Sequence, residues 1–339
     1  MLGKPKLNLG YRGPNDFIAK IIIARAAPKK KSYIFVEGRD DIAAFQKHCV
    51  FNCKIQELNS RENVIKLIQE ASREEYPAGS GRKGIDGILG IVDRDWTDFI
   101  KSEDPLPNRV VVLPELNDLE SLVLYHLGYE VLSGIIRDTN RNISPWHDES
   151  QNKQPFEMLI NNIVSPLGAL RVAWQTSAGT SNYKLDDSDE IGRVARIAWE
   201  IGSKSPGVQI TPLQLLNKIF EGQSLRYADE NKQKLIALKA DQYLAKHSTE
   251  TEAWKLVKGK DLVNILAHSV LASKAELAIY ETDNLSKIRE RIKMAITAQF
   301  NRKLISECEL DKSVAKATKS DTVTFEYFLP AGTGLQAVA

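Results

Sequence analysis

The sequence predicts a mixed α/β fold, in which a mostly parallel sheet flanked by helices is followed by a mainly helical domain. Short apolar runs alternate with helical patterns from residue 33 to about residue 136. Two of these runs, 88–93 and 109–115, are apolar over most of their length, as strands buried on both faces require. Residues 137–155 are polar and rich in structure breakers, which predicts a linker or long loop, and almost only helical patterns occur beyond them.

In the first half the expected order is strand, helix, strand, helix, strand, strand. These elements cover residues 33–37, 40–48, 53–58, 61–75, 88–93 and 109–115. The helix over 61–75 has an apolar face, and Asn59 with Glu62 three positions on predicts a capping box at its start. Strands that alternate with helices favour a parallel sheet covered by helices.

In the second half, six helices are expected. They cover residues 156–164, 190–202, 211–222, 230–247, 260–272 and 285–300. Thr211 followed by Pro212 is a strong helix-start signal. We therefore expect a basic N-terminal arm or helix (1–31), an α/β domain (32–136), a helical domain (137–310) and a C-terminal tail (311–339) that could add an edge strand.

Charge is unevenly distributed along the 339 residues, although the formal net charge is only +2. Residues 1–31 carry eight basic side chains and one acid (8 − 1 = +7), and residues 284–319 carry nine and four (9 − 4 = +5). Basic ends around a more acidic middle suit phosphate binding, as does the start of the helix near Lys258 and Lys260. We expect these two lysines to track a nucleic-acid backbone together with Lys29, Lys30 and Lys31.

Residues 17–27 are apolar but include Lys20 and Arg25, and the run is too short to cross a membrane. It is expected to form an amphipathic helix of a cytoplasmic protein without membrane association.

Carboxylates follow the predicted strands. Glu37 ends the first strand, Asp93 ends the strand over 88–93, and Glu120 follows the next strand. Asp95 lies two positions after Asp93, so we expect an extended chain to place both carboxylates on the same side. Open α/β sheets place ligands at the carboxyl ends of their strands, and acids gathered there repel one another unless they share a cation or a proton. Mg²⁺, with Mn²⁺ as an alternative, suits such oxygen ligands and can promote phosphodiester cleavage. Glu37 would lie beside the metal and serve as a general acid or base, and Gly38 would let a phosphate approach.

The stretches "FVEGRDDIAAF", "GIVDRDWTDF", "LNDLESLVL" and "WKLVKGKDLVNIL" together resemble a family of bacterial proteins with an OLD-like TOPRIM domain. Some members are the nuclease effectors of the PARIS anti-phage system. The likeness covers residues 30 to 130 well and is thin beyond them. It implies that Glu37 is the catalytic glutamate, that Asp93 and Asp95 are the metal-binding pair, and that Glu120 is a further metal ligand. It also implies a toxic effector that is restrained by an ABC-type ATPase partner, dimerises when released and cuts tRNA.

Other interpretations stay open. "IVDRDWT" also fits the Asp-x-Asp-x-Thr opening of haloacid-dehalogenase-like phosphatases, in which Asp93 would be the nucleophile and Asp95 the acid/base. The two aspartates could be only a turn and a helix cap. The chain could also be a non-catalytic module that binds nucleic acid or an ATPase.

Overall fold

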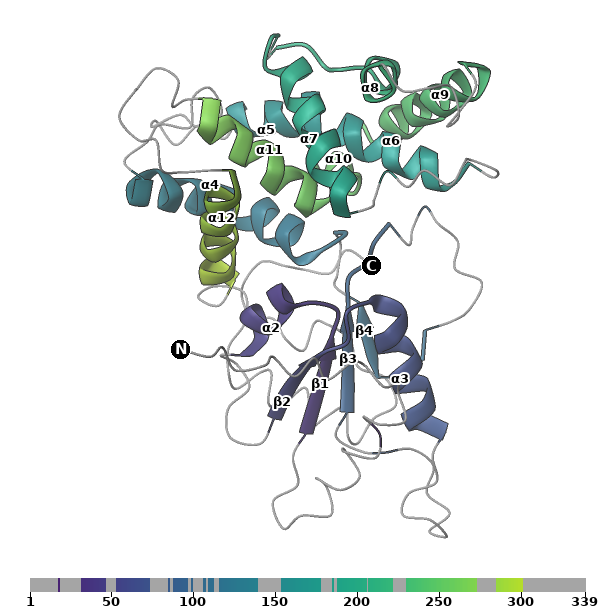
Figure 1. Cartoon of the computed structure of the whole chain (residues 1–339), viewed down its shortest axis with the longest axis vertical. Coiled ribbons are helices and arrows are strands. Elements are labelled where there is room, and N and C mark those ends of the chain that lie inside the picture. Colours follow the sequence, from purple (N-terminus) through teal and green to yellow (C-terminus); the bar gives the residue numbers. More distant parts are fainter. Residues whose placement is uncertain are drawn as a thin grey trace, which may run out of the picture. The chain divides into compact units, whose positions relative to one another are not determined.

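The computed structural model of the chain is drawn in Figure 1. It describes residues 18, 32–46, 53–73, 85, 88–96, 99, 106–107, 109–112, 116–139, 154–177, 185, 188–205, 207–221, 230–272 and 285–300. The expected basic arm, apart from Ile18, and the expected C-terminal tail lie outside the described residues. So do Lys29, Lys30 and Lys31.

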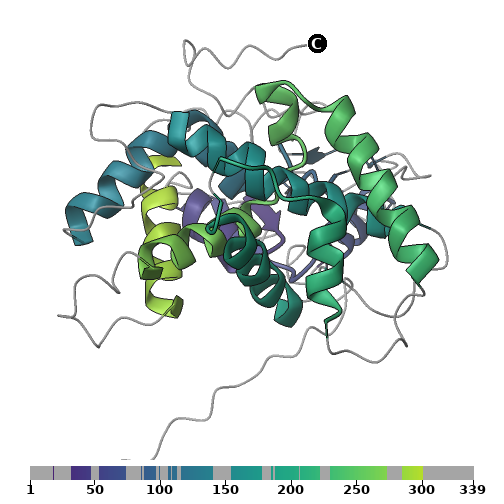
Figure 2. The same cartoon turned by 90° about the horizontal axis from the view of Figure 1, so that it is seen from above.

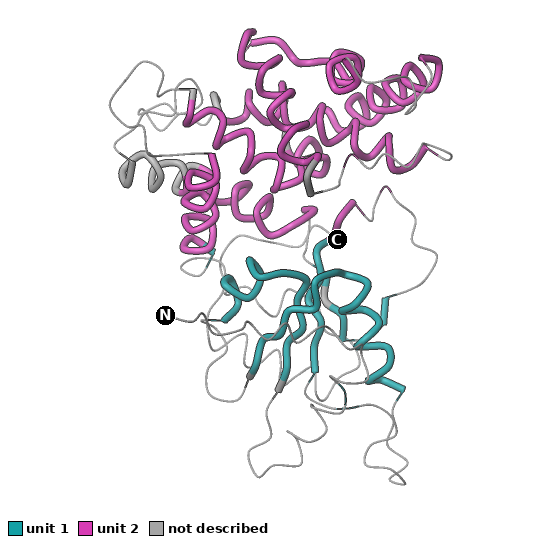
Figure 3. Tube along the Cα trace, in the orientation of Figure 1, with its two compact units in different colours: residues 1–93, 104–113, 300–339 teal, residues 94–103, 114–299 magenta. Residues whose placement is uncertain are grey.

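The chain forms two compact units (Figure 3). Unit 1 comprises Met1–Asp93, Asp104–Leu113 and Phe300–Ala339, and unit 2 comprises Arg94–Glu103 and Pro114–Gln299. The sequence-predicted acids are therefore divided between the units: Glu37 and Asp93 belong to unit 1, and Asp95 and Glu120 belong to unit 2.

Unit 1 contains a four-stranded parallel sheet in the order β2-β1-β3-β4. Its strands are β1 (Ser32–Val36), β2 (Cys53–Glu57), β3 (Ile88–Val92) and β4 (Val110–Val112). All five residues of β3 are buried, which agrees with its nearly continuous apolar sequence. The predicted mixed α/β class with a parallel sheet is thus confirmed.

Two helices belong to this sheet, α2 (Arg39–Phe45) and α3 (Arg61–Arg73) (Figure 1). The apolar face of α3 packs on the sheet. The resulting core contains Val64, Leu67, Ile68 and Ala71 from α3, together with Phe35, Ile88, Val92 and Val110 from the strands.

The predicted capping box of α3 is wrong by one residue. Ser60 is the cap: its Oγ accepts the backbone N–H of Asn63 at 3.2 Å, and its carbonyl accepts that of Val64. Asn59 instead has a positive φ of 64°, a conformation that asparagine tolerates better than most residues. The chain therefore turns at Asn59 before the helix begins.

Unit 2 is helical, and all six helices expected there are present. Its elements are α4 (Leu119–Thr139), α5 (Gln154–Leu159), the π-helix η2 (Ile160–Val164), α6 (Ser165–Gln175), α7 (Ser188–Gly202), α8 (Pro212–Ile219), α9 (Glu230–Lys246), α10 (Glu250–Trp254), α11 (Gly259–Ala272) and α12 (Leu285–Gln299). The Thr211 cap of α8 is confirmed, since its side chain accepts the Gln214 N–H at 3.2 Å. The helices α6 and α10 were not expected.

The core of unit 2 is built around α6 and α11. α6 is buried from Ser165 through Trp174 and packs on α9, whereas α11 packs on α4, α7 and α12 (Figure 2). A buried ion pair joins the two central helices. Arg171 of α6 donates from Nε and Nη2 to the two carboxylate oxygens of Asp261 of α11, each at 2.7 Å, and from Nη1 to the Leu185 carbonyl. Bidentate geometry of this kind is the strongest form of an arginine–carboxylate pair.

Among the described residues, none of the helices combines the length and the hydropathy that a membrane span requires.

Candidate functional site

Glu37 and Asp93 lie together at the carboxyl ends of neighbouring strands. β1 and β3 are parallel and in register, with Phe35 opposite Gly90. This register brings the residues after the two strands close to each other, although they are 56 positions apart in the sequence. The backbone N–H of Asp93 donates to Glu37 Oε1 at 2.8 Å, and both residues are half-buried. The structure thus joins the two predicted acids of unit 1.

Gly38 and Asp41 form the start of α2 next to this pair. Asp41 Oδ2 accepts the Gly38 N–H at 2.8 Å, so Asp41 belongs to the helix cap. The backbone of Gly38 is extended (φ −139°), and among the described residues a Cβ placed there would meet only Asp41 Oδ2, at 3.8 Å. The fold itself therefore does not require glycine at this position. That leaves room for the predicted approach of a ligand.

Arg61 is the cationic residue that sequence reasoning missed at this edge. Its Nη1 donates to the backbone carbonyl of Asp93, from the first turn of α3. The nearby Arg39–Glu57 pair is looser, with 3.6 Å between Nε and Oε2, and its arginine is 90% exposed. Such exposed pairs contribute little to stability. Arg61 therefore fixes the backbone at the end of β3 more firmly than Arg39 fixes β2.

In unit 2, Asp95 lies in a tight turn. Sequence reasoning placed Asp93 and Asp95 on the same side of an extended chain, and this is wrong. β3 ends at Val92, and Asp95 and Trp96 have left-handed backbones with φ of 46° and 58°. Non-glycine residues adopt this conformation rarely, and two in succession need an external partner.

Asn117 is that partner. Its carbonyl accepts the Asp95 N–H at 2.9 Å, and its Oδ1 accepts the Trp96 N–H at 3.0 Å. Its Nδ2 donates to the carbonyls of Lys255 (2.8 Å) and Val257 (2.7 Å). Asn117 is only 4% exposed. Because its partners are far away in the sequence, no local signal could have identified it.

Asp118 caps the helix that carries Glu120. Asp118 Oδ1 accepts the Ser121 N–H at 2.9 Å, and Ser121 Oγ donates back to the Asp118 carbonyl at 3.0 Å. Glu120 occupies the first turn of α4 and is 7% exposed. The sequence "LNDLES" thus places Glu120 in the first turn of a helix whose start is held by the Asp118 carboxylate and the Ser121 hydroxyl.

The segment Lys255–Gly259 packs directly on this loop. Asp118 Oδ2 accepts the Gly259 N–H at 2.8 Å, and a Cβ on Gly259 would lie 2.3 Å from Asp118 Oδ1. Lys258 Nζ lies 5.1 Å from the centre of the Trp96 ring, and Lys260 is exposed. The first amide of α11, which was predicted to favour a phosphate, is therefore bonded to a carboxylate of the chain itself.

Oxygen ligands for a divalent cation are available in both units. Glu37 and Asp93 offer carboxylates in unit 1, and Asp95 and Glu120 offer carboxylates in unit 2. This all-oxygen set fits the preference of Mg²⁺. Within the part of the chain that the structure describes, no three His, Cys, Asp or Glu side chains are already grouped as a metal site.

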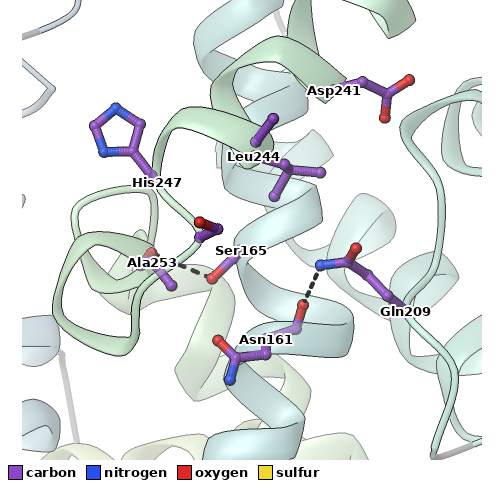
Figure 4. Close-up of a pocket in the computed structure, with 9 residues that line it drawn as sticks. Asn161, Ser165, Gln209, Asp241, Leu244, His247 and Ala253 are labelled. Atoms are coloured by element: carbon purple, nitrogen blue, oxygen red, sulfur yellow. Dashed lines mark hydrogen bonds between the residues drawn. The ribbon is translucent and has the colours of Figure 1, made fainter.

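A separate cavity of about 360 Å³ lies in unit 2 (Figure 4). Asn161, Ser165 and Gln209 line it, and Ser165 Oγ donates to the Ala253 carbonyl at 3.2 Å. Burial raises the pKa of Asp241 at its rim. None of the sequence-predicted acids lines this cavity.

A small charged network lies beside the cavity. Glu252 accepts from Lys255 Nζ at 2.6 Å and contacts His247 Nδ1 at 2.8 Å. The hydrogen bond from Lys255, with a smaller contribution from His247, holds the pKa of Glu252 below its usual value. This network fixes α10 just before the segment that Asn117 binds.

Comparison with known proteins found no similar family model, no similar curated protein and no similar solved structure.

Proposed function

We propose that this chain is a Mg²⁺-dependent nuclease with a TOPRIM-like α/β unit, which cleaves phosphodiester bonds. One observation carries the proposal: the Glu37 carboxylate accepts the Asp93 amide at the carboxyl edge of a parallel sheet. Ligands of open α/β sheets bind at this edge. The likeness of the surrounding motifs to OLD-like TOPRIM proteins supports the same assignment.

Glu37, Asp93, Asp95 and Glu120 would hold the cation, with Mn²⁺ as an alternative to Mg²⁺. When bound, the cation supplies Lewis-acid polarisation of a phosphate oxygen and stabilises negative charge. The residues of the chain do the rest. Glu37 holds or transfers a proton next to the reacting phosphate, and the space over Gly38 admits the nucleic-acid backbone. Arg61 keeps the end of β3, and with it Asp93, in place.

Each link in the proposed set of four acids is short. Glu37 is hydrogen-bonded to Asp93, and only Arg94 separates Asp93 from Asp95, so the chain itself limits their Cα separation to roughly 7 Å. The Asp95 amide is bonded to Asn117, three residues before Glu120. These links support a shared role for acids that are far apart in the sequence.

The likeness to PARIS effectors extends the proposal to a biological role. The chain would act in the cytoplasm as a toxic effector of anti-phage defence. An ABC-type ATPase partner would restrain it, and after release it would dimerise and cut tRNA. Lys258 and Lys260 would contact the nucleic-acid backbone, together with Lys29, Lys30 and Lys31.

Glu37→Gln is the central test. Glutamine keeps an Oε1 that can accept the Asp93 N–H, so the fold is expected to persist while proton transfer and metal binding are impaired. Loss of a general acid/base lowers rates by about 10²- to 10⁴-fold. Glu57→Gln is a matched control, because Glu57 also ends a strand of the same sheet. Cleavage of tRNA, other RNA and DNA would be measured with Mg²⁺ or Mn²⁺, alongside toxicity in cells.

The outcomes separate the alternatives. A nuclease loses cleavage and toxicity in Glu37→Gln but not in Glu57→Gln. If neither variant changes toxicity or partner binding, the chain acts as a binding module and the nuclease proposal is wrong. Hydrolysis of small phosphate esters with a phosphorylated Asp93, without cutting of nucleic acid, would instead identify a haloacid-dehalogenase-like phosphatase.

A further inference from the structure

Asn117 makes three of the four hydrogen bonds open to its side chain inside unit 2. Its amide makes two donor bonds and one acceptor bond, and its backbone carbonyl makes a fourth, all between 2.7 and 3.0 Å. The four bonds connect three segments, 95–96, 117 and 255–257. A buried asparagine whose two donors and carbonyl oxygen are all engaged holds its neighbours in a defined arrangement.

The segment that most needs this support is the turn at Asp95. Two consecutive residues with positive φ are unfavourable for L-amino acids, and such backbones persist only where the surroundings fix them. Asn117 accepts both amides of this turn. Removal of the Asn117 side chain would leave the buried Trp96 amide without its acceptor and would let the turn relax toward a commoner conformation.

The other end of the connection lies in Lys255–Gly259. The carbonyls of Lys255 and Val257 accept from Asn117, and the Gly259 amide donates to the adjacent Asp118. Lys258 lies over the Trp96 ring, so this segment contacts the Asp95 turn directly as well as through Asn117. The position of the turn is therefore tied to a segment about 160 residues further along the chain.

We propose that Asn117 is a positioning residue, which sets the place of the Asp95 carboxylate by coupling its turn to Lys255–Gly259. The inference rests on the proposed function for its effect on catalysis, but its structural part stands independently of it. Because the same asparagine also holds Lys255–Gly259, displacement of that segment would move Asp95.

The test uses two variants, Asn117→Ala and the isosteric Asn117→Asp. The aspartate variant keeps an acceptor for the Trp96 N–H but loses both donors to the Lys255 and Val257 carbonyls. Asn264→Ala is the matched control. Asn264 is also a buried asparagine of unit 2 (6% exposed), and its partners are Lys260 and Arg289 rather than the turn. Three quantities are measured on the full chain: amide hydrogen exchange at Asp95 and Trp96, the Mg²⁺ concentration for half-maximal cleavage, and the unfolding midpoint.

In the wild type, the Asp95 and Trp96 amides are expected to exchange slowly although they lie in a turn. In both Asn117 variants they exchange faster, and the Mg²⁺ requirement rises by about 10- to 100-fold, the usual effect of losing a residue that orients a metal ligand. Asn264→Ala lowers the unfolding midpoint without changing either quantity. A purely structural role would change stability but not the Mg²⁺ requirement.

Fast exchange of both amides in the wild type overturns the inference without any variant, even if the Asn117 variants fail to fold. An Mg²⁺ requirement that rises no more in the Asn117 variants than in Asn264→Ala overturns it as well. If the wild type cleaves no nucleic acid while the exchange pattern is as expected, the proposed function fails and the coupling of the turn to Lys255–Gly259 is upheld.

Discussion

The buried pair between Arg171 and Asp261 allows a quantitative prediction. Their side chains are 0% and 1% exposed, and they share two hydrogen bonds of 2.7 Å. Asp261→Asn removes the negative charge and leaves the arginine charged inside the core of unit 2. Breaking a buried pair in this way costs about 3–5 kcal/mol of unfolding free energy. For a unit of this size, that corresponds to a fall in melting temperature of about 6–20 °C.

Replacing both partners has a different expected result. Arg171→Leu with Asp261→Leu removes both charges and leaves neither unpaired, so its cost should be well below the sum of the two single changes. The Leu185 carbonyl also loses its partner in this double variant, which keeps some penalty.

Tryptophan fluorescence in a urea titration is the appropriate assay. All five tryptophans, Trp96, Trp146, Trp174, Trp199 and Trp254, fall within unit 2, so the signal reports that unit alone. The reasoning is refuted if Asp261→Asn costs less than about 1 kcal/mol, the range of an exposed pair. It is also refuted if the single and double variants are additive.

Two further predictions concern stability in unit 2. Gly259→Ala would place a Cβ 2.3 Å from Asp118 Oδ1 and 2.5 Å from Glu120 Cβ, so we expect a loss of about 1–3 kcal/mol of unfolding free energy in urea. Gly207→Ala should cost far less, because no atom of the described residues lies within 4 Å of its Cβ position. Burial, and to a smaller extent the nearby Arg196, lowers the pKa of His268 below its ordinary value of 6.5. The neutral form of His268 therefore stabilises the fold fully above pH 6.5, and this stabilisation is lost as the pH falls from 6.5 toward the folded-state pKa. His268→Gln should therefore reduce the loss of stability between pH 7.5 and pH 5.5, and an unchanged pH dependence would contradict this assignment.

The sheet could be predicted from the sequence because each strand carries its own signal. The run 88–92 is apolar on both faces, and all its residues are buried in the structure. The same reasoning located Glu37 and Asp93 at strand ends, since parallel strands align their carboxyl ends. The loop after β3 was not predictable, because the left-handed backbone at Asp95 depends on Asn117 rather than on its own sequence.

The helix α6 was not predicted, because its sequence lacks the periodic signal that a half-buried helix carries. Residues 165–174 are buried on every side, so the sequence has no polar face and no helical periodicity. Pro166 and Gly168 are weak helix signals, although proline in the first turn is compatible with a helix. The Gly168 position lies against the Leu256 carbonyl, where a Cβ would be only 1.7 Å away. Close packing of backbones, which no local pattern encodes, explains the glycine.

The start of α11 shows why charge alone is insufficient to assign a phosphate site. Lys258 and Lys260 next to a helix N-terminus predict one, yet the Gly259 amide already donates to Asp118. The positive end of this helix is therefore used inside unit 2, where it holds the loop that carries Glu120. A phosphate at the same amide would have to displace the Asp118 carboxylate and with it the cap of α4. Any nucleic-acid contact at this segment must therefore come from the lysine ammonium groups and not from the helix end.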